Sequence, residues 1–144
     1  MHPELLFQIG NLIVLPAWIL LLTLPGNRYT RILVHSGLWS ALLGIGYTAL
    51  LLSRIGRVSG GFGSLAQVSL LFMDPWTLLA GWIHYLAFDL FVGAWIVRDA
   101  RERAVPRILW SLCLLPAFLF GPVGLCLYLG IRNLLSLRSA NRAV

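Results

Sequence analysis

The stretch from Trp76 to Val97 most constrains the fold, because it is a long apolar run with an acid near its middle. As a helix its 22 residues would cross a hydrocarbon core of roughly 30 Å. An aspartate at that depth costs on the order of 2.5 to 3.5 kcal/mol on insertion scales, and it normally faces protein or trapped water at a functional site. We therefore expect a membrane-spanning helix with Asp89 directed inward.

Helical geometry, at about 100° per residue, separates the polar residues of this stretch into two groups. His84 lies about 140° away from Asp89, on the side that carries Phe88. We therefore expect His84 and Asp89 not to touch. The face of Asp89 carries Trp82, Tyr85, Asp89, Gly93 and Ile96.

The composition fits an integral membrane protein, since 59% of the residues are hydrophobic and 11% are charged. We predict one all-α membrane domain, 1–144, with four transmembrane helices in a single bundle. A short interfacial or re-entrant helix is expected at 65–73, between the second and third spans, because this segment is too short to cross. The predicted spans are 5–24, 32–52, 76–97 and 108–131.

The other predicted spans carry residues with both a structural and a functional interpretation. Asn11 is expected to hydrogen-bond between helices, with a ligand contact as the alternative. His35 is interpreted as an interfacial or capping histidine, or as part of a site. Gly121-Pro122 predicts a kink that lines the interior of Asp89, with close helix packing as an equal alternative. A stripe of small residues is expected to be buried against a neighbouring helix, and it comprises Gly37, Ala41, Gly44 and Thr48.

The charged residues exclude several classes of function. The 11 basic residues are all arginine, so no lysine can form a Schiff base with retinal. Three histidines are too few for a histidine-rich di-iron site, and we expect neither a metal nor a cofactor. The arginines flank the apolar segments, which favours lipid headgroups over nucleic acid as partners. Four spans would place six arginines on one side and five on the other, which leaves the orientation open. Two i,i+4 ion pairs are predicted, Arg98 with Glu102 and Asp99 with Arg103.

Three blocks of the chain resemble the abscisic-acid-deficient-four-like, or neoxanthin-synthase-like, membrane proteins. They are 60–65, 79–96 with Arg98-Asp99, and 120–125 with Tyr128 and Arg132. The plant namesake of the family is implicated in making neoxanthin from violaxanthin. The sequence shows no plastid-targeting extension, so we expect a multi-pass protein of a bacterial inner (cytoplasmic) membrane.

The resemblance implies an isomerase that opens an epoxide of a carotenoid or related isoprenoid lipid, which needs an acid and a base but no redox cofactor. Asp89, His84 and Tyr85 are the candidate catalytic residues. The alternative is a non-catalytic carotenoid-binding, lipid-binding or assembly protein, and proton passage is a weaker third hypothesis. The expected partners are a membrane lipid or carotenoid, a second copy of the chain, or a carotenoid-pathway enzyme. The candidate substrate-binding residues are Trp82, Phe88, Gly93, Asn11, His35, Gly121 and Pro122.

Overall fold

A computed structural model describes residues 2–140, with side chains placed through Leu137, and the regular elements in this range are all helical. Three helical segments are long and apolar enough to cross a membrane: Pro3–Thr23, Arg28–Arg54 and Pro75–Glu102. The second of these is irregular at its start, where a π-helical turn ends before Gly37 at φ 82°. The elements are α1 (Pro3–Thr23), α2 (Arg28–Thr30), η1 (Arg31–His35), α3 (Leu38–Arg54), α4 (Leu65–Phe72), α5 (Pro75–Glu102), α6 (Arg107–Leu119) and α7 (Gly121–Ala140).

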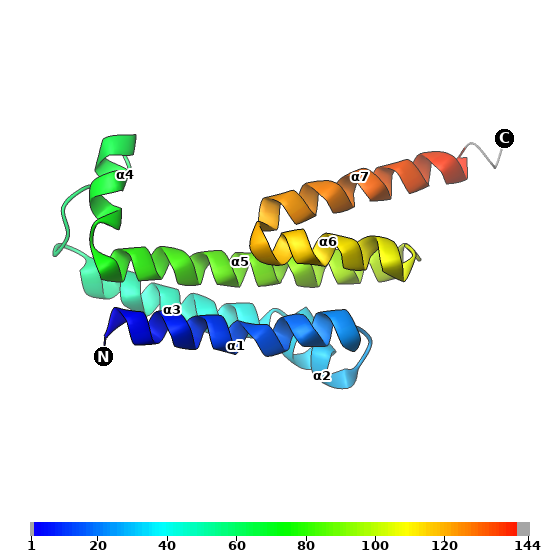
Figure 1. Ribbon diagram of the computed structural model, residues 1–144, viewed down its shortest axis with the longest axis horizontal. Helices are drawn as coiled ribbons and strands as arrows, with labels where there is room; N and C mark the ends of the chain where they lie inside the picture. The colour runs from blue at the N-terminus through cyan, green and yellow to red at the C-terminus, as the bar shows by residue number, and fades with distance from the viewer. Residues whose placement is uncertain (1, 141–144) are drawn as a thin grey trace.

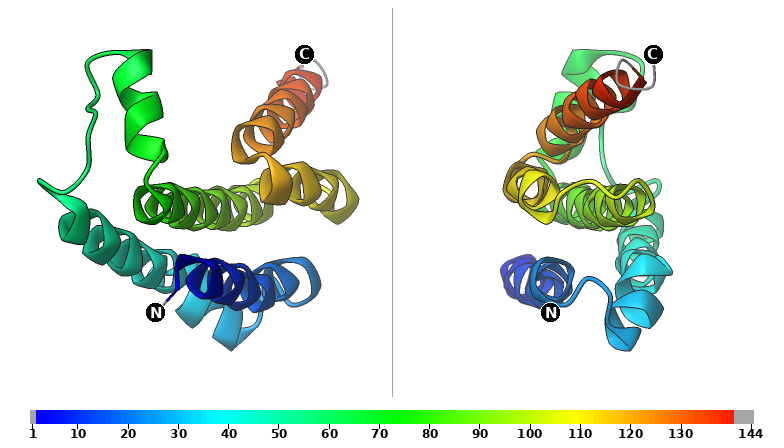
Figure 2. Two further views of the ribbon diagram at one scale, coloured as in Figure 1. Left: turned by 60° about the vertical axis from the view of Figure 1, so that its left-hand side comes forward. Right: turned by 90° about the vertical axis from the view of Figure 1, so that its right-hand side faces the viewer.

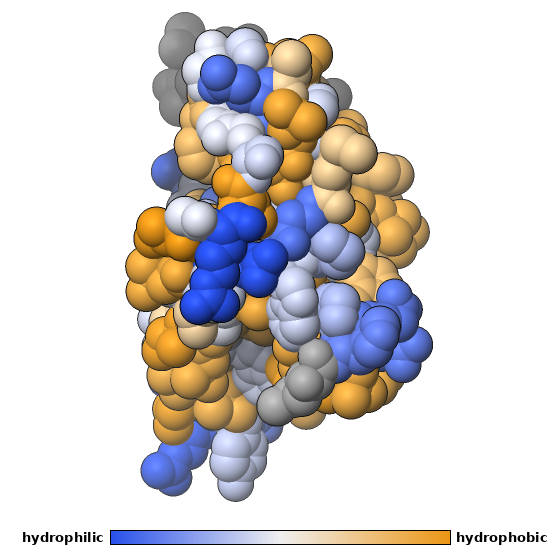
Figure 3. All heavy atoms as spheres, turned by 90° about the vertical axis from the view of Figure 1, so that its left-hand side faces the viewer, coloured by the Kyte–Doolittle hydropathy of each residue, from blue (hydrophilic) through white to orange (hydrophobic). Residues whose placement is uncertain are grey.

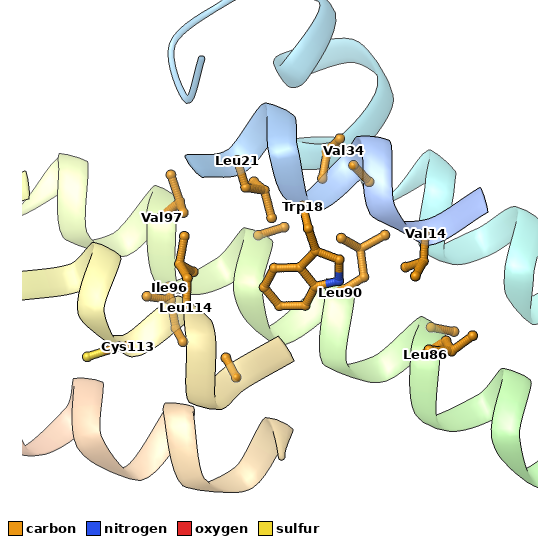
Figure 4. Close-up of a cluster of buried hydrophobic side chains, with 14 of the residues drawn as sticks. Val14, Trp18, Leu21, Val34, Leu86, Leu90, Ile96, Val97, Cys113 and Leu114 are labelled. Carbon is orange, nitrogen blue, oxygen red and sulfur yellow. The ribbon is translucent and has the colours of Figure 1, made fainter. Parts of the chain in front are cut away.

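Helix α5 is the centre of the molecule. Figures 1 and 2 show α1 and α3 on one side of it and the pair α6 and α7 on the other. Its apolar window is 56% buried, against 28% for α1 and 6% for the segment that contains α3. Trp18 of α1 lies at the centre of the apolar core in Figure 4. Gly93 lets this ring approach, because a Cβ there would stand only 2.5 Å from the indole.

The segment predicted as a fourth span, 108–131, is a helical hairpin and not one helix. Helix α6 starts beside the end of α1, where Arg107 donates to the Leu22 and Thr23 carbonyls. The chain turns at Phe120 beside the middle of α5, and α7 runs back toward the end from which α6 came (Figure 1). Pro122 therefore lies in the first turn of α7, where its missing N–H is tolerated, and does not kink a longer helix. The described residues thus contain three candidate spans, so the structure does not clearly show the four that were predicted.

Helix α4 confirms the predicted short helix, although it ends one residue earlier than expected. Ser64 caps it by accepting a hydrogen bond from the Gln67 N–H, and none of its residues is buried. In Figure 1 it stands across the long axis of the bundle, a direction that fits a helix lying in a membrane interface. Figure 3 looks onto this end of the molecule, where hydrophilic side chains gather on the end face and hydrophobic ones flank them.

The small-residue stripe on α3 is not buried against another helix within this chain, contrary to expectation. A Cβ placed at Gly37 or at Gly44 would meet nothing within 4 Å. Helix α3 does pack on α5, but it does so through another face that carries Leu43. The stripe instead borders an open groove between α3 and α5.

Candidate functional site

Asp89 lies at the tip of the α6–α7 hairpin and is 6% exposed. Its carboxyl group accepts a hydrogen bond from the backbone N–H of Gly121, the first residue of α7. A helix start leaves such N–H groups without partners inside the helix, and a carboxylate there also meets the positive end of the helix dipole. Gly121 is required at this point, because a Cβ on it would overlap Oδ1 of Asp89. The expectation that Asp89 and Gly121 share one interior is confirmed.

Tyr85 connects Asp89 to the last carbonyl of α6. It lies one turn before Asp89 on α5, and its hydroxyl contacts the Asp89 carboxyl group. The same hydroxyl donates a hydrogen bond to the Leu119 carbonyl, which has no partner inside α6 because the helix ends there. The second carboxyl oxygen of Asp89, Oδ2, is buried and has no hydrogen-bond partner among the described residues. The hairpin tip therefore holds a chain of three polar groups with one acceptor site left open.

The surroundings of this polar chain are apolar and partly uncovered. The hairpin reaches only about the middle of α5, so the face of α5 beyond the tip is not covered by α6 or α7 (Figure 1). Trp82, Leu119 and Phe120 around the tip are 37%, 47% and 61% exposed. A long apolar molecule could lie against these side chains with its end group toward Asp89.

Trp82 and Asn11 form a contact between helices. The Trp82 indole N–H donates to Asn11 Oδ1 at 2.8 Å, and the ring also packs 5.2 Å from the rings of Phe7 and Tyr85. This confirms the interhelical interpretation of Asn11. This hydrogen bond occupies the side-chain oxygen of Asn11 and holds Trp82 beside Tyr85. The space beside Gly93 is occupied by the Trp18 ring. Pro122 is exposed at the start of α7.

His84 belongs to a different face of α5, as predicted, and lies in the groove between α3 and α5. Its ring stacks on Phe88 at 4.6 Å between centroids and meets Tyr47 edge-on at 5.2 Å. The groove has a volume of about 720 Å³ and is lined almost entirely by apolar groups, including Gly44 of the small-residue stripe. The structure therefore brings Asp89 and Tyr85 together and leaves His84 apart from both.

A second acidic site lies ten residues after Asp89 on the same helix. Asp99 accepts hydrogen bonds from the Tyr128 hydroxyl at 2.5 Å and from Arg103 Nε at 3.0 Å, and Arg132 forms an ion pair with it at 3.4 Å. We call these four residues the Asp99 cluster. It confirms the predicted pair with Arg103 and fastens α7 to the end of α5. Arg98 does not pair with Glu102 but donates to the backbone carbonyl of His35 at 2.5 Å.

Sequence reasoning assigned no role to two groups that complete these sites. The Leu119 carbonyl is available to Tyr85 only because α6 ends at Leu119, and the sequence pattern does not predict that end. Tyr128 carried a usable signal, since it stands four residues before Arg132 on an apolar helix and so shares a face with it. His35 lies outside both acidic sites, with Nε2 at 2.9 Å from the Pro25 carbonyl.

Comparison with known proteins gives a family for this architecture. The family model described as ABA DEFICIENT 4-like matches residues 5–128. A relative from Arabidopsis thaliana, the chloroplastic protein ABA DEFICIENT 4, is 30% identical in an alignment of 128 residues that covers 83% of this chain and 56% of the relative. The chain thus spans little more than half the length of that relative. No solved structure matches. The expected bacterial inner membrane finds no support here, because the relative is a chloroplast protein. With most of its length matched, the chain belongs to the ABA DEFICIENT 4-like family.

Proposed function

We propose that this chain is an integral membrane protein that isomerises a carotenoid or related isoprenoid lipid, with Asp89 as its acid and base. The observation that carries the proposal is the buried Asp89 carboxyl group, which touches Tyr85 and keeps one oxygen without a partner. No arginine lies within ion-pair distance of it among the residues the structure describes. An acid that only stabilised the fold would be expected to have its second oxygen satisfied as well.

The contacts of Tyr85 at the tip supply a hydroxyl group that could relay a proton. Tyr85 has one hydroxyl proton, and it gives that proton to the Leu119 carbonyl, which can only accept. The same hydroxyl contacts the Asp89 carboxyl group, so a rotation of the O–H bond would let it donate to Asp89 instead. In the proposal Asp89 carries a proton before the reaction and transfers it to the substrate.

The proposed reaction conserves atoms and electrons. Asp89 gives its proton to the epoxide oxygen of the substrate while the C–O bond breaks, which forms an alcohol. The carboxylate then accepts the proton lost from a neighbouring carbon, whose C–H electron pair becomes the new C=C bond. The carboxylate takes up this proton directly or through the Tyr85 hydroxyl, which regenerates the protonated Asp89. One carboxyl group thus serves as acid and base in turn, and the net change is an isomerisation.

Access to Asp89 fits a substrate that arrives from the lipid phase. The exposed apolar residues at the tip, Trp82, Leu119 and Phe120, would contact a polyene chain. Because Oδ2 has no exposed surface, an end group would reach it only after side chains at the tip move aside. The plant relative's name and the family membership support this class of lipid.

The groove beside His84 favours a second function, the binding of such a lipid without chemistry. Its apolar lining and its volume of about 720 Å³ suit part of a long hydrocarbon. Gly44→Leu would fill the groove. Gly46→Leu on the same helix is the matched control, since Gly46 does not line the groove and has open space around it. Loss of co-purifying pigment in Gly44→Leu alone would support this function.

Expression in a host that makes epoxy-carotenoids tests the proposed isomerase. We expect a changed pigment profile with the wild-type chain. Asp89→Asn should lower conversion by roughly 10²- to 10⁴-fold, the range for loss of a general acid or base. Tyr85→Phe should follow with a smaller loss. Tyr29→Phe, which removes an exposed hydroxyl far from the tip, serves as the control. Normal conversion by correctly inserted Asp89→Asn would refute the catalytic role, and pigment that co-purifies unchanged would favour binding.

A further inference from the structure

A pocket rich in arginine lies where η1 and the loop between α1 and α2 meet the end of α5, and the proposed isomerase does not use it. It has a volume of about 380 Å³. Three arginines line it, two from α5 and one from η1, together with His35 of the π-helical turn. The lining residues are Arg31, Arg98, Arg101, His35, Pro25, Gly26, Ser36 and Glu102.

Backbone contacts hold two of the guanidinium groups at this pocket. Arg98 donates to the carbonyl of His35 at 2.5 Å, which leaves its other N–H groups for a ligand. The guanidinium of Arg101 lies against Gly26, where a Cβ would stand only 2.7 Å from Nη1. The lack of a side chain at Gly26 therefore makes room for Arg101. The π-helical turn, a form of backbone frequent at functional sites, brings Arg31 to the third side.

No ion pair among the described side chains involves the arginines of this pocket. The three ion pairs between described side chains involve Arg54, Arg103 and Arg132, so the arginines of the pocket have no carboxylate partner in that part of the chain. Glu102 is the one acid in the lining, and it is exposed. Nearby guanidinium groups repel one another, so an anion between them would stabilise this end of the bundle.

We propose that this pocket binds a phosphate group through Arg31, Arg98 and Arg101. A guanidinium presents a planar fork of N–H groups that matches two phosphate oxygens, and several such groups around one space suit a phosphate with more than one charged oxygen. The pocket also lies at an end of the candidate spans, where lipid headgroups stand. An anionic phospholipid headgroup and free phosphate share this chemistry. The site does not depend on the proposed isomerase.

Binding to the purified full chain in a nonionic detergent tests this site. The probes are dioctanoyl phosphatidylglycerol, dioctanoylglycerol as the same lipid without phosphate, and inorganic phosphate. We expect saturable binding of the phospholipid and at least about tenfold weaker binding after Arg101→Gln, since charge-assisted hydrogen bonds to phosphate are strong. Arg101→Lys keeps the charge but not the planar fork of N–H groups. Its affinity for the phospholipid should lie between that of the wild type and that of Arg101→Gln. Competition by millimolar inorganic phosphate would assign free phosphate as the ligand, and its absence would assign the headgroup.

Arg57→Gln is the matched control, because it removes the same charge from an exposed residue at the other end of the bundle. Equal weakening in Arg57→Gln and Arg101→Gln would show attraction by net charge alone and overturn the site. Equal binding of dioctanoylglycerol would overturn it too, because only the acyl chains would then be recognised. Arg31→Gln provides a second variant if Arg101→Gln fails to fold.

Discussion

Helix α5 carries two acids that the fold treats differently. Asp99 is surrounded by two arginines and a tyrosine hydroxyl, so its charge is neutralised and its oxygens are satisfied. Asp89 meets a backbone N–H and a tyrosine hydroxyl, but no cation among the described residues, and one of its oxygens has no partner. The same residue type on one helix thus fastens α7 in one case and keeps a buried carboxyl oxygen without a partner in the other. The difference lies in what the hairpin brings to each acid.

The largest effect is expected from Gly121→Ala, which disturbs the Asp89 site directly. The new Cβ would overlap Oδ1 of Asp89, so the carboxyl group or the start of α7 must move. We expect a loss of about 1 to 3 kcal/mol of stability from overpacking, together with loss of pigment conversion. Gly130→Ala is the control, because that glycine has open space around it. Equal melting temperatures for the two variants would show that the contact at the tip is not tight.

Asp99→Asn should chiefly lower stability, whereas Asp89→Asn should chiefly lower pigment conversion. It leaves Arg132 and Arg103 without their carboxylate, so we expect a loss of about 2 kcal/mol in detergent, reduced from the value for a fully buried pair because Arg103 is half exposed. Asp89→Asn leaves no cation behind and should destabilise less. Thermal unfolding of both variants checks this. A larger loss in Asp89→Asn would contradict the division between the two acids.

Tyr128→Phe should weaken the Asp99 cluster by a smaller amount. The variant removes one hydrogen bond to a charged group but keeps both arginines and the buried ring, which meets Trp95 edge-on at 5.7 Å. We expect a loss of about 1.5 kcal/mol and unchanged pigment conversion per folded protein. Melting temperature and conversion are measured on the same preparation. A loss of conversion without a loss of stability would mean that the cluster serves the reaction.

The smallest effect concerns a third acid, Asp74, which lies between candidate spans. Burial raises its pKa, but hydrogen bonds from Thr77 and the charge of Arg54 outweigh this and hold the pKa of Asp74 below its ordinary value. The stabilisation, about 1 kcal/mol or less, is therefore present above the unfolded pKa near 4 and is lost as pH falls through the folded pKa. Asp74→Asn keeps the helix cap without the charge. Its melting temperature should approach that of the wild type as pH drops below about 4, and a constant difference would contradict this account.

The sequence predicted the helical class, the central helix and the inward direction of Asp89, because apolar length and the cost of a buried acid are local properties. It predicted the neighbourhood of Gly121 and Asp89 because backbone groups freed by a proline inside a membrane need polar surroundings. The sequence did not predict the hairpin, because an apolar run with an internal proline has the same pattern whether the helix bends or ends near that proline. The turn after α6 contacts Tyr85 and Asp89, which are more than 30 residues away and cannot be placed there by a local pattern. The stripe on α3 was misjudged because small residues show that an approach is possible, not that a neighbour exists.

The hairpin also changes how the chain would be oriented in a membrane. If the three candidate spans each cross a membrane, a hairpin that enters and leaves on one side adds no crossing, and α1 would begin and α7 would end on opposite sides. Arg132, which a fourth span would have carried across, instead lies near the start of the hairpin, beside Asp99 at the end of α5. Nine arginines have described side chains; Arg54 and Arg57 lie at one end, and the other end holds Arg28, Arg31, Arg98, Arg101, Arg103, Arg107 and Arg132. An excess of arginine beside membrane spans marks the side of the membrane from which the segments that carry it are not translocated. The Asp99 cluster and the arginine pocket would then face the compartment in which the chain is inserted, with the α4 end on the far side.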